Sequence, residues 1–334
     1  MSGSAILGTA AAKKPEEITV RRNFGDSLSV SELVQKRDQI IKNWKRNNRT
    51  RRKRYSVWTP NVPDELSIVA FDFKMSDDGV PLQKIGYTNK SVGVEEVQDS
   101  VTHANYRRTD SHSVSTQTVT TQSGEDWSTW NTLSSDQSHY SYYDGSGNLE
   151  GVLTQEYEHK VDPDDGSTDY NWHAVQTGSD MEAGTNRDSS NPWENSYSTI
   201  YHHWSNADSE LNIDMQDRKP RGTTSGTVTT SYTLDSSGPS VSFSYSQPTV
   251  DVTDGSSMSI NEGEWSMDIT AGSDPAKTNT YFEPASIAQL TPPGYCRSGG
   301  WTIGTFDITC EFRDSSFGGS HSHDAPNYSL GLGC

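Results

Sequence analysis

The sequence predicts a mainly β fold: an antiparallel β-sandwich-like body with one N-terminal amphipathic helix. From residue 55 onward, short runs of alternating apolar and polar residues are separated by Gly, Asp, Ser and Pro, a pattern typical of strands and turns. Only 30% of the chain is hydrophobic, yet nine Trp, fifteen Tyr and eight Phe supply large side chains that bury well. We therefore expect a thin, aromatic core between strands.

The helix is predicted from Ser29 to Trp44. Apolar residues recur there at intervals of three, four and seven, the period of one helical face. Ser29 followed by Glu32 has the spacing of a capping box. The apolar positions are Val30, Leu33, Val34, Ile40, Ile41 and Trp44.

Strand signals follow. Residues 66–73 are apolar on both faces and predict a central strand. Residues 228–234 and 241–245 alternate with small polar residues around a turn at 235–239, which predicts a hairpin with one buried face. A second hairpin is expected over 140–161, and Gly304 is expected to mark a β-bulge. The polar segments 109–136 and 178–195 are predicted to be long loops or edge strands.

Charge divides the chain into three expected parts: a flexible N-terminus or residual export signal (1–12), a basic helical arm (13–54) and an acidic β-rich body (55–334), with two subdomains as an alternative for the body. Residues 1–54 have a net charge of +9 and the rest −27, in a total of −18. Lysine is scarce in the body, which is typical of proteins adapted to high salt. No stretch has the roughly 20 apolar residues of a spanning helix, so no transmembrane segment is expected.

Several residues are candidate sites. His321 and His323 alternate, so on a strand both imidazoles face one side, where with Asp324 they form a candidate zinc site. The alternative is a solvated polar tail. Asp162, Asp164 and Asp169 surround a glycine in a candidate calcium loop, for which an acidic turn is the alternative. No other cofactor is expected.

Two further sets of residues carry predictions. Cys296 and Cys310 are a candidate disulfide, with Cys334 left over. A basic run follows the helix and has three candidate uses: binding of phosphate or another anion, recognition by a processing protease, and pairing with the acidic body. The run consists of Arg49, Arg51, Arg52, Lys53 and Arg54.

Catalytic signatures are missing: the sequence holds neither a Gly-x-Ser-x-Gly elbow nor a phosphate loop. The first hypothesis is therefore a non-catalytic structural or binding protein, secreted or exposed on the surface of a salt-adapted microbe, with a protein or surface glycan as partner. One alternative is a virion or assembly component, which binds nucleic acid only through the basic arm and is found in the virion or cytoplasm. Others are a secreted toxin or bacteriocin-like precursor cut near residue 54 and a metal-dependent hydrolase.

Overall fold

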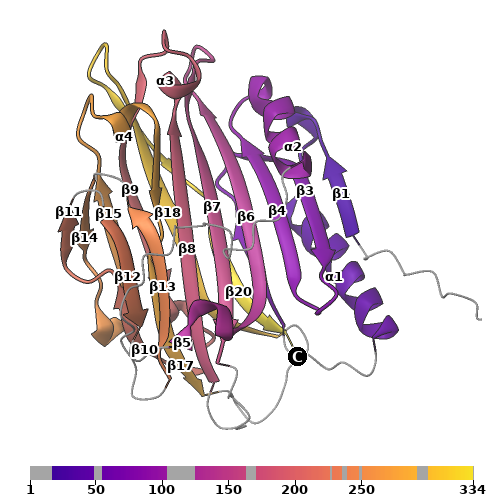
Figure 1. The fold of residues 1–334 in the computed structure, drawn as a ribbon. Helices are drawn as coiled ribbons and strands as arrows, with labels where there is room; N and C mark the ends of the chain where they lie inside the picture. Colours follow the sequence, from indigo (N-terminus) through magenta and orange to yellow (C-terminus); the bar gives the residue numbers. More distant parts are fainter. Residues whose placement is uncertain are drawn as a thin grey trace, which may run out of the picture.

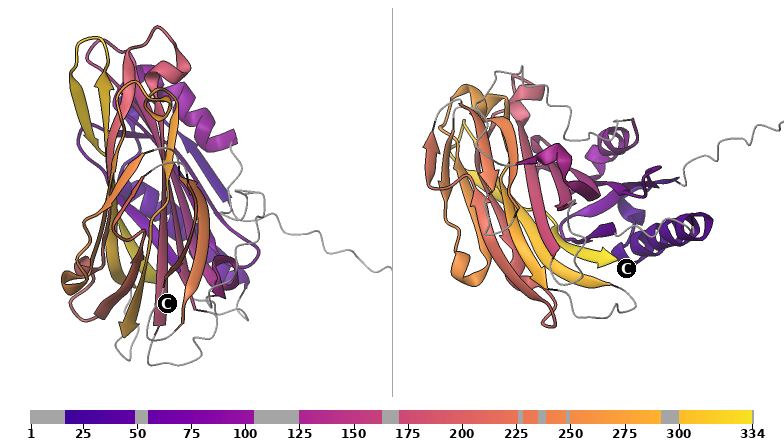
Figure 2. Two further views of the ribbon diagram at one scale, coloured as in Figure 1. Left: turned by 60° about the vertical axis from the view of Figure 1, so that its left-hand side comes forward. Right: turned by 60° about the horizontal axis from the view of Figure 1, so that its bottom comes forward.

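A computed structural model of the protein describes residues 17–48, 55–103, 125–162, 171–225, 228–234, 239–247, 250–291 and 300–333. The predicted mainly β fold is confirmed. Two large sheets, called sheet A and sheet B below, pack face to face, and a small third sheet lies against the outer face of sheet A (Figures 1 and 2). Within the described ranges, no helix is long and apolar enough to span a bilayer.

Sheet A has the strand order β1-β3-β4-β6-β7-β8-β17-β10, with β16 beside β8. Neighbouring strands are antiparallel except β4 and β6, which are parallel and are joined by a segment that contains α2. The strands are β1 (Glu17–Arg21), β3 (Ser67–Met75), β4 (Pro81–Thr88), β6 (Asn131–Tyr143), β7 (Leu149–Val161), β8 (Asn171–Ala183), β10 (Asn212–Lys219), β16 (Asn279–Phe282) and β17 (Ala285–Thr291).

Sheet B is antiparallel, with the order β11-β14-β15-β9-β18-β20-β2 and β19 beside β18. Its strands are β2 (Tyr55–Asn61), β9 (Trp193–His203), β11 (Thr223–Ser225), β14 (Asp251–Asp254), β15 (Glu262–Asp268), β18 (Trp301–Asp314), β19 (Ser320–Asp324) and β20 (Asn327–Gly333). The third sheet consists of β12 (Val228–Leu234), β13 (Val241–Gln247) and β5 (Glu125–Asp126).

The predicted amphipathic helix is confirmed as α1 (Val30–Asn47). The Ser29 hydroxyl accepts a hydrogen bond from the Glu32 backbone N–H, as the capping-box spacing predicts. The buried face of α1 includes Leu33 and Trp44 and packs against β2 and β3. Arg37 on this face is also buried and donates to the Trp58 carbonyl oxygen at 2.9 Å. The helix is thus held to both sheets.

The described residues also form three α-helices shorter than α1. Helix α2 (Val94–His103) covers β3, β4 and β6 of sheet A (Figure 1). A Cβ atom at Gly86 would collide with Val97 and Val101, so this glycine allows α2 to lie directly on the sheet. Two single-turn helices, α3 (Gly184–Arg187) and α4 (Asp274–Lys277), lie near one end of the sandwich (Figure 1).

The basic arm predicted over residues 13–54 is packed onto the body where the structure describes it. β1 is the edge strand of sheet A, paired with β3, and α1 rests on β2 and β3. The predicted boundary at residue 54 stays a prediction, but the elements on its two sides share a core. A cut there would leave residues 17–48 attached by these contacts alone.

The core between sheets A and B is aromatic, as composition predicts. Trp58 of sheet B stacks on Tyr157 of sheet A with centroids 4.9 Å apart, and Tyr328 lies 5.1 Å from Tyr157. Polar groups are interleaved with these rings: the hydroxyls of Tyr87 and Tyr328 are 2.7 Å apart, and Ser138 also contacts the Tyr328 hydroxyl. Hydroxyl groups at these positions of the interior are thus paired with each other.

Both predicted hairpins, the strand over 66–73 and the bulge at Gly304 are confirmed; the register of β18 against β20 shifts between Thr302 and Gly304. The loop or edge-strand prediction is wrong for residues 131–136, 178–183 and 193–195, which lie in the interior strands β6, β8 and β9. The physical reason is interior pairing of polar groups. For example, Ser134 is 2.5 Å from Ser56 of the opposing sheet.

Candidate functional site

The segment around β12 and β13 has an unusual composition. Asp235 is the only charged residue between Gly222 and Val250, in a chain that is 22% charged. Along both arms every second residue is Ser or Thr. These residues are Thr223, Ser225, Thr227, Thr229, Ser231 and Thr233 on the first arm and Ser240, Ser242, Ser244 and Ser246 on the second.

The register of β12 against β13 aligns these Ser and Thr residues in one row across the hairpin. Ser and Thr positions pair with one another across the hairpin, as Thr233 does with Ser242, while Leu234 pairs with Val241. Leu234 and Val241 are fully buried, whereas Thr233 and Ser242 are half-buried and their hydroxyls are 2.8 Å apart. The hairpin therefore has one docked apolar row and one Ser/Thr row turned away from the core.

The hairpin continues from sheet B. β11 and β14, which flank it in sequence, pair with each other at the edge of sheet B, from Thr223 opposite Thr253 to Ser225 opposite Asp251. We call residues 223–254 the ribbon: its base belongs to sheet B, and its distal part, β12 and β13, lies on the outer face of sheet A (Figure 1). There β12 lies against β10 and β17, and β13 against β16.

The Trp127 side chain contacts the ribbon. Its ring packs edge to face on Phe243 of β13, with centroids 6.0 Å apart. Its indole Nε1 donates to Glu158 Oε2 at 2.7 Å, and Lys160 Nζ donates to the Trp127 carbonyl oxygen at 2.8 Å. Since Glu158 and Lys160 are buried residues of β7, Trp127 connects sheet A to the docked ribbon.

Backbone pairing between the ribbon and the rest of the molecule is sparse there. In the described part of the chain, β12 and β13 share no ladder with sheet A; β13 pairs only with β12 and with the two-residue strand β5, in which Glu125 lies opposite Val241. Side-chain packing thus holds the distal ribbon in place, with few main-chain hydrogen bonds to break on release.

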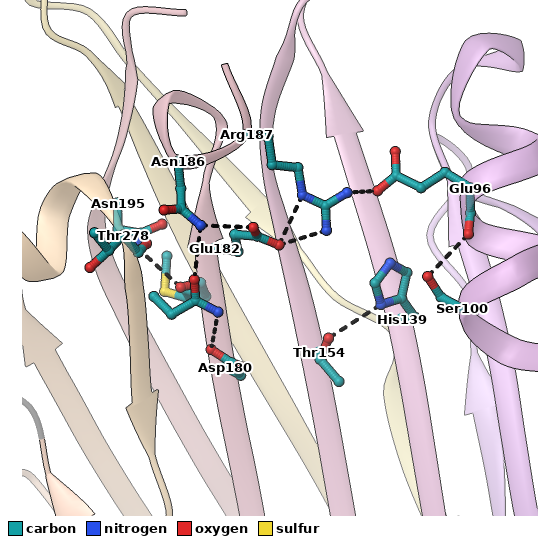
Figure 3. A network of polar contacts seen from close by, with 12 residues as sticks. Glu96, Ser100, His139, Thr154, Asp180, Glu182, Asn186, Arg187, Asn195 and Thr278 are labelled. Carbon is teal, nitrogen blue, oxygen red and sulfur yellow. Dashed lines mark hydrogen bonds and ion pairs between the residues drawn. The ribbon is translucent and has the colours of Figure 1, made fainter. Parts of the chain in front are cut away.

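A polar network at the end of the sandwich near α3 fixes sheet A independently of the ribbon (Figure 3). Arg187 of α3 donates to Glu182 of β8 through Nε at 2.9 Å and Nη2 at 2.6 Å, and it also contacts Glu96 of α2. Asn186 donates to Glu182 at 2.9 Å and to Asn279 of β16 at 3.2 Å. The strand β16, on which β13 rests, is therefore anchored to β8 and α3.

The two histidines of the predicted zinc site share a buried carboxylate. His321 Nδ1 lies 2.6 Å from Glu150 Oε1, and His323 Nε2 lies 2.6 Å from Glu150 Oε2. The His323 ring also stacks on Tyr142 with centroids 4.2 Å apart. Since Glu150 belongs to β7 and both histidines to β19, this cluster fastens sheet B to sheet A.

The third predicted zinc ligand, Asp324, lines a cavity of about 310 Å³ together with Asn61 and Asn327. Over the ranges that the structure describes, no group of three or more His, Cys, Asp and Glu side chains is arranged to hold a metal ion. In the structure both imidazoles interact with Glu150. The zinc site stays a prediction.

Other predicted site residues fall largely outside the described ranges. Asp162 of the candidate calcium loop is buried at the end of β7, but Asp164 and Asp169 lie outside. Cys310 is buried in β18, where burial raises the pKa of its thiol well above the usual value. Its candidate partner Cys296 lies outside, so the disulfide stays a prediction. The whole basic run lies outside as well: Arg49, Arg51, Arg52, Lys53 and Arg54.

Comparison with known proteins gave no family. No family model matches the chain, and no curated protein matches it. Among solved structures, a protein described as "Pore forming protein" aligns over 60% of this chain and 90% of its own length, at 11% identity and a TM-score of 0.29. The Clostridium perfringens NetB toxin in its membrane-inserted form aligns over 59% and 94%, at 9% identity and a TM-score of 0.23.

Proposed function

We propose that this protein is a secreted protein that acts on membranes without catalysis, by releasing the β12–β13 part of its ribbon and inserting it into a lipid bilayer. The observation that carries the proposal is a hairpin with one charge, in which Ser/Thr residues pair with Ser/Thr residues in one row and the other row is apolar near its tip, where Tyr232 pairs with Phe243 and Leu234 with Val241. Strands that cross a bilayer alternate in this way, with apolar residues toward lipid and polar residues toward water.

The dimensions of the ribbon fit this role. A strand that crosses a bilayer at a tilt needs roughly 9 to 11 residues. Strands β12 and β13 have seven residues each, and the uncharged arms that contain them, residues 223–234 and 239–250, have 12 each, which is enough to cover this span. The single charged residue, Asp235, lies between the two arms in sequence, so insertion of both arms would carry it to the far side of the bilayer.

Release is physically accessible because the distal ribbon is docked by side chains. Its apolar row, which includes Leu234, Val241 and Phe243, is buried against sheet A and would be transferred from one apolar environment to another. An isolated hairpin leaves main-chain groups unpaired on its two outer edges, which is costly in lipid. Insertion therefore requires several copies of the protein, whose hairpins pair edge to edge.

The test is dye release from phosphatidylcholine vesicles by the full chain and two variants. Phe243→Asp places a charge in the apolar row, and the matched control Ser242→Asp places the same charge in the neighbouring Ser/Thr row. A charge on the lipid-facing side costs about 2–4 kcal/mol at the bilayer centre, whereas the water-facing side tolerates it. We expect wild-type protein to release dye, Phe243→Asp to release it at least about tenfold more slowly, and Ser242→Asp to behave like wild type.

Equal dye release by Phe243→Asp and wild type would contradict the proposal, and so would equal loss of release in both variants. Circular dichroism of each variant establishes that it is folded before it is compared. If wild-type protein releases no dye at any pH from about 5 to 9, membrane insertion is excluded, and the surface-binding role becomes the leading hypothesis.

A further inference from the structure

A buried carboxyl group lies where the ribbon docks. Glu283 joins β16 to β17, the two strands covered by β13 and β12 respectively, and only 4% of its surface is exposed. The neighbouring Tyr281 hydroxyl lowers its pKa, whereas Glu156 and Glu158 of β7 act on it as like charges and raise its pKa. Glu283 is therefore enclosed by an aromatic hydroxyl and two further acids.

These groups lie on the same face of sheet A as Trp127. Glu156 and Glu158 are two residues apart in β7 and therefore lie on the same face of the strand, and Glu158 accepts a hydrogen bond from the Trp127 indole. Glu156 lies opposite Gly178 of β8, and a Cβ atom at Gly178 would be 3.0 Å from the Tyr281 hydroxyl. The acids are therefore on the outer face, beneath the ribbon.

Among the described side chains, two lysines bring positive charge to this cluster, and Lys84 of β4 is attracted to Glu156. Lys160 is 3.5 Å from Glu158, and Asp180 of β8 adds a further negative charge near Tyr281. The described side chains of the distal ribbon, at residues 233–234 and 239–243, carry no charge. Ionised Glu283 would thus lie among other acids and away from water, an arrangement that favours its protonated form.

We propose that Glu283 is a pH-dependent latch for the ribbon: its protonated carboxyl is stable beneath the docked hairpin, and its ionisation drives the hairpin off sheet A. This inference rests on the proposed function, because it describes how the same hairpin is released. Desolvation first, and then repulsion by Glu156 and Glu158, raises the pKa of Glu283 to about 8 in the docked state.

The sign of the pH dependence follows. With the ribbon released, water reaches Glu283 and its pKa returns toward the usual value for Glu, about 4.3. Because the docked state binds the proton more tightly, docking is most stable below that value and weakens as the pH rises to about 8. The fraction of released ribbon is expected to increase by up to about tenfold per pH unit in this window.

The test is hydrogen–deuterium exchange of residues 228–247 in the full chain, without membranes, between about pH 5 and 9. Each rate is divided by the intrinsic exchange rate at that pH, so that the ratio reports opening of the hairpin. We expect the ratio to rise with pH in wild type and to be nearly flat in Glu283→Gln, whose neutral amide mimics the protonated acid. Glu95→Gln, at an exposed position of α2, is the matched control and should follow wild type.

A second variant keeps Glu283 in place. Glu156→Gln removes one of the two neighbouring acids, so the upper end of the pH window should move to lower pH. A wild-type ratio independent of pH would overturn the latch, and so would an undiminished pH dependence in Glu283→Gln.

Vesicle dye release is measured in parallel, so that failure of the membrane function can be distinguished from failure of the latch. pH-dependent exchange without dye release would contradict the membrane function and leave the latch intact. Dye release from a protein whose exchange ratio is flat with pH would leave the membrane function intact and contradict the latch.

Discussion

Asp136 lies between the two large sheets, and its carboxyl accepts hydrogen bonds from Gln83 at 2.5 Å and from Ser138 at 3.1 Å. Desolvation outweighs these bonds and raises the pKa of Asp136 to about 7. At the residue scale the interior is therefore chemically mixed: paired hydroxyls, amides and carboxyls occupy sites that aliphatic side chains fill in most cores.

Substitution of Asp136 tests this mixed interior. The pKa of Asp136 is raised in the folded state, so its contribution to stability is full at low pH and is lost as the pH rises through about 7. Between about pH 5 and 8 the free energy of unfolding should therefore decrease less for Asp136→Asn than for wild type, by at most about 3 kcal/mol. Urea titrations at several pH values measure it. If the free energy of unfolding changes with pH in the same way in both proteins, Asp136 ionises freely in the folded state.

Sequence reasoning identified only part of the Glu150 cluster. The alternation of His321 and His323 correctly placed both rings on one side of a strand, facing a carboxylate. The acid is Glu150, 171 positions before His321, rather than the adjacent Asp324. Alternation determines which face a side chain occupies, but it carries no information about the sheet that packs against that face.

At the scale of elements, the hairpin and α1 were predictable because each buries one face that repeats with a regular period. The interior parts of β6, β8 and β9 were not predictable, because residues such as Ser134 and Asp136 are polar and were expected to face solvent. They are buried because partners from other strands, Ser56 and Gln83, complete their hydrogen bonds. Such partners are set by tertiary packing. The docking of the ribbon on sheet A through Trp127 could not be predicted from the sequence for the same reason.

The role of Trp127 as a link can be tested at this scale. Trp127→Ala removes the ring that contacts Phe243 and the indole bound to Glu158, and truncation of a packed Trp costs about 3–5 kcal/mol. About 1.4 kcal/mol changes an equilibrium constant by a factor of ten, so hydrogen–deuterium exchange of residues 228–247 should accelerate at least about tenfold. Peptides from β9 and β15 serve as internal controls and should exchange as in wild type. Equal acceleration in those peptides would indicate general destabilisation instead of ribbon release.

The whole molecule carries a net charge of −18. Self-repulsion of an acidic body opposes compaction and is screened by salt, with a Debye length of about 10 Å at 0.1 M. Adaptation to high salt stays a prediction of the composition. Strand β1 brings positive charge from the N-terminal part of the chain onto this body, as in the ion pair of Arg21 with Asp99 of α2 at 3.3 Å.

Salt dependence tests this property. The midpoint of thermal unfolding should rise steadily between about 0.05 and 2 M KCl, because screening weakens repulsion among the acids in the folded state. Sucrose at matched osmolality is the control for effects of solvent exclusion and water activity. A midpoint that is constant or falls with KCl would contradict a salt-adapted surface.

In sheet B, the first strand in sequence pairs with the last one. β2 lies antiparallel to β20, from Tyr55 opposite Gly333 to Asn61 opposite Asn327. Contacts of such long sequence separation slow folding, and this sheet cannot be completed on the ribosome until residues 327–333 have been synthesised. Strand β2 consequently stays without its partner in sheet B until β20 has been synthesised.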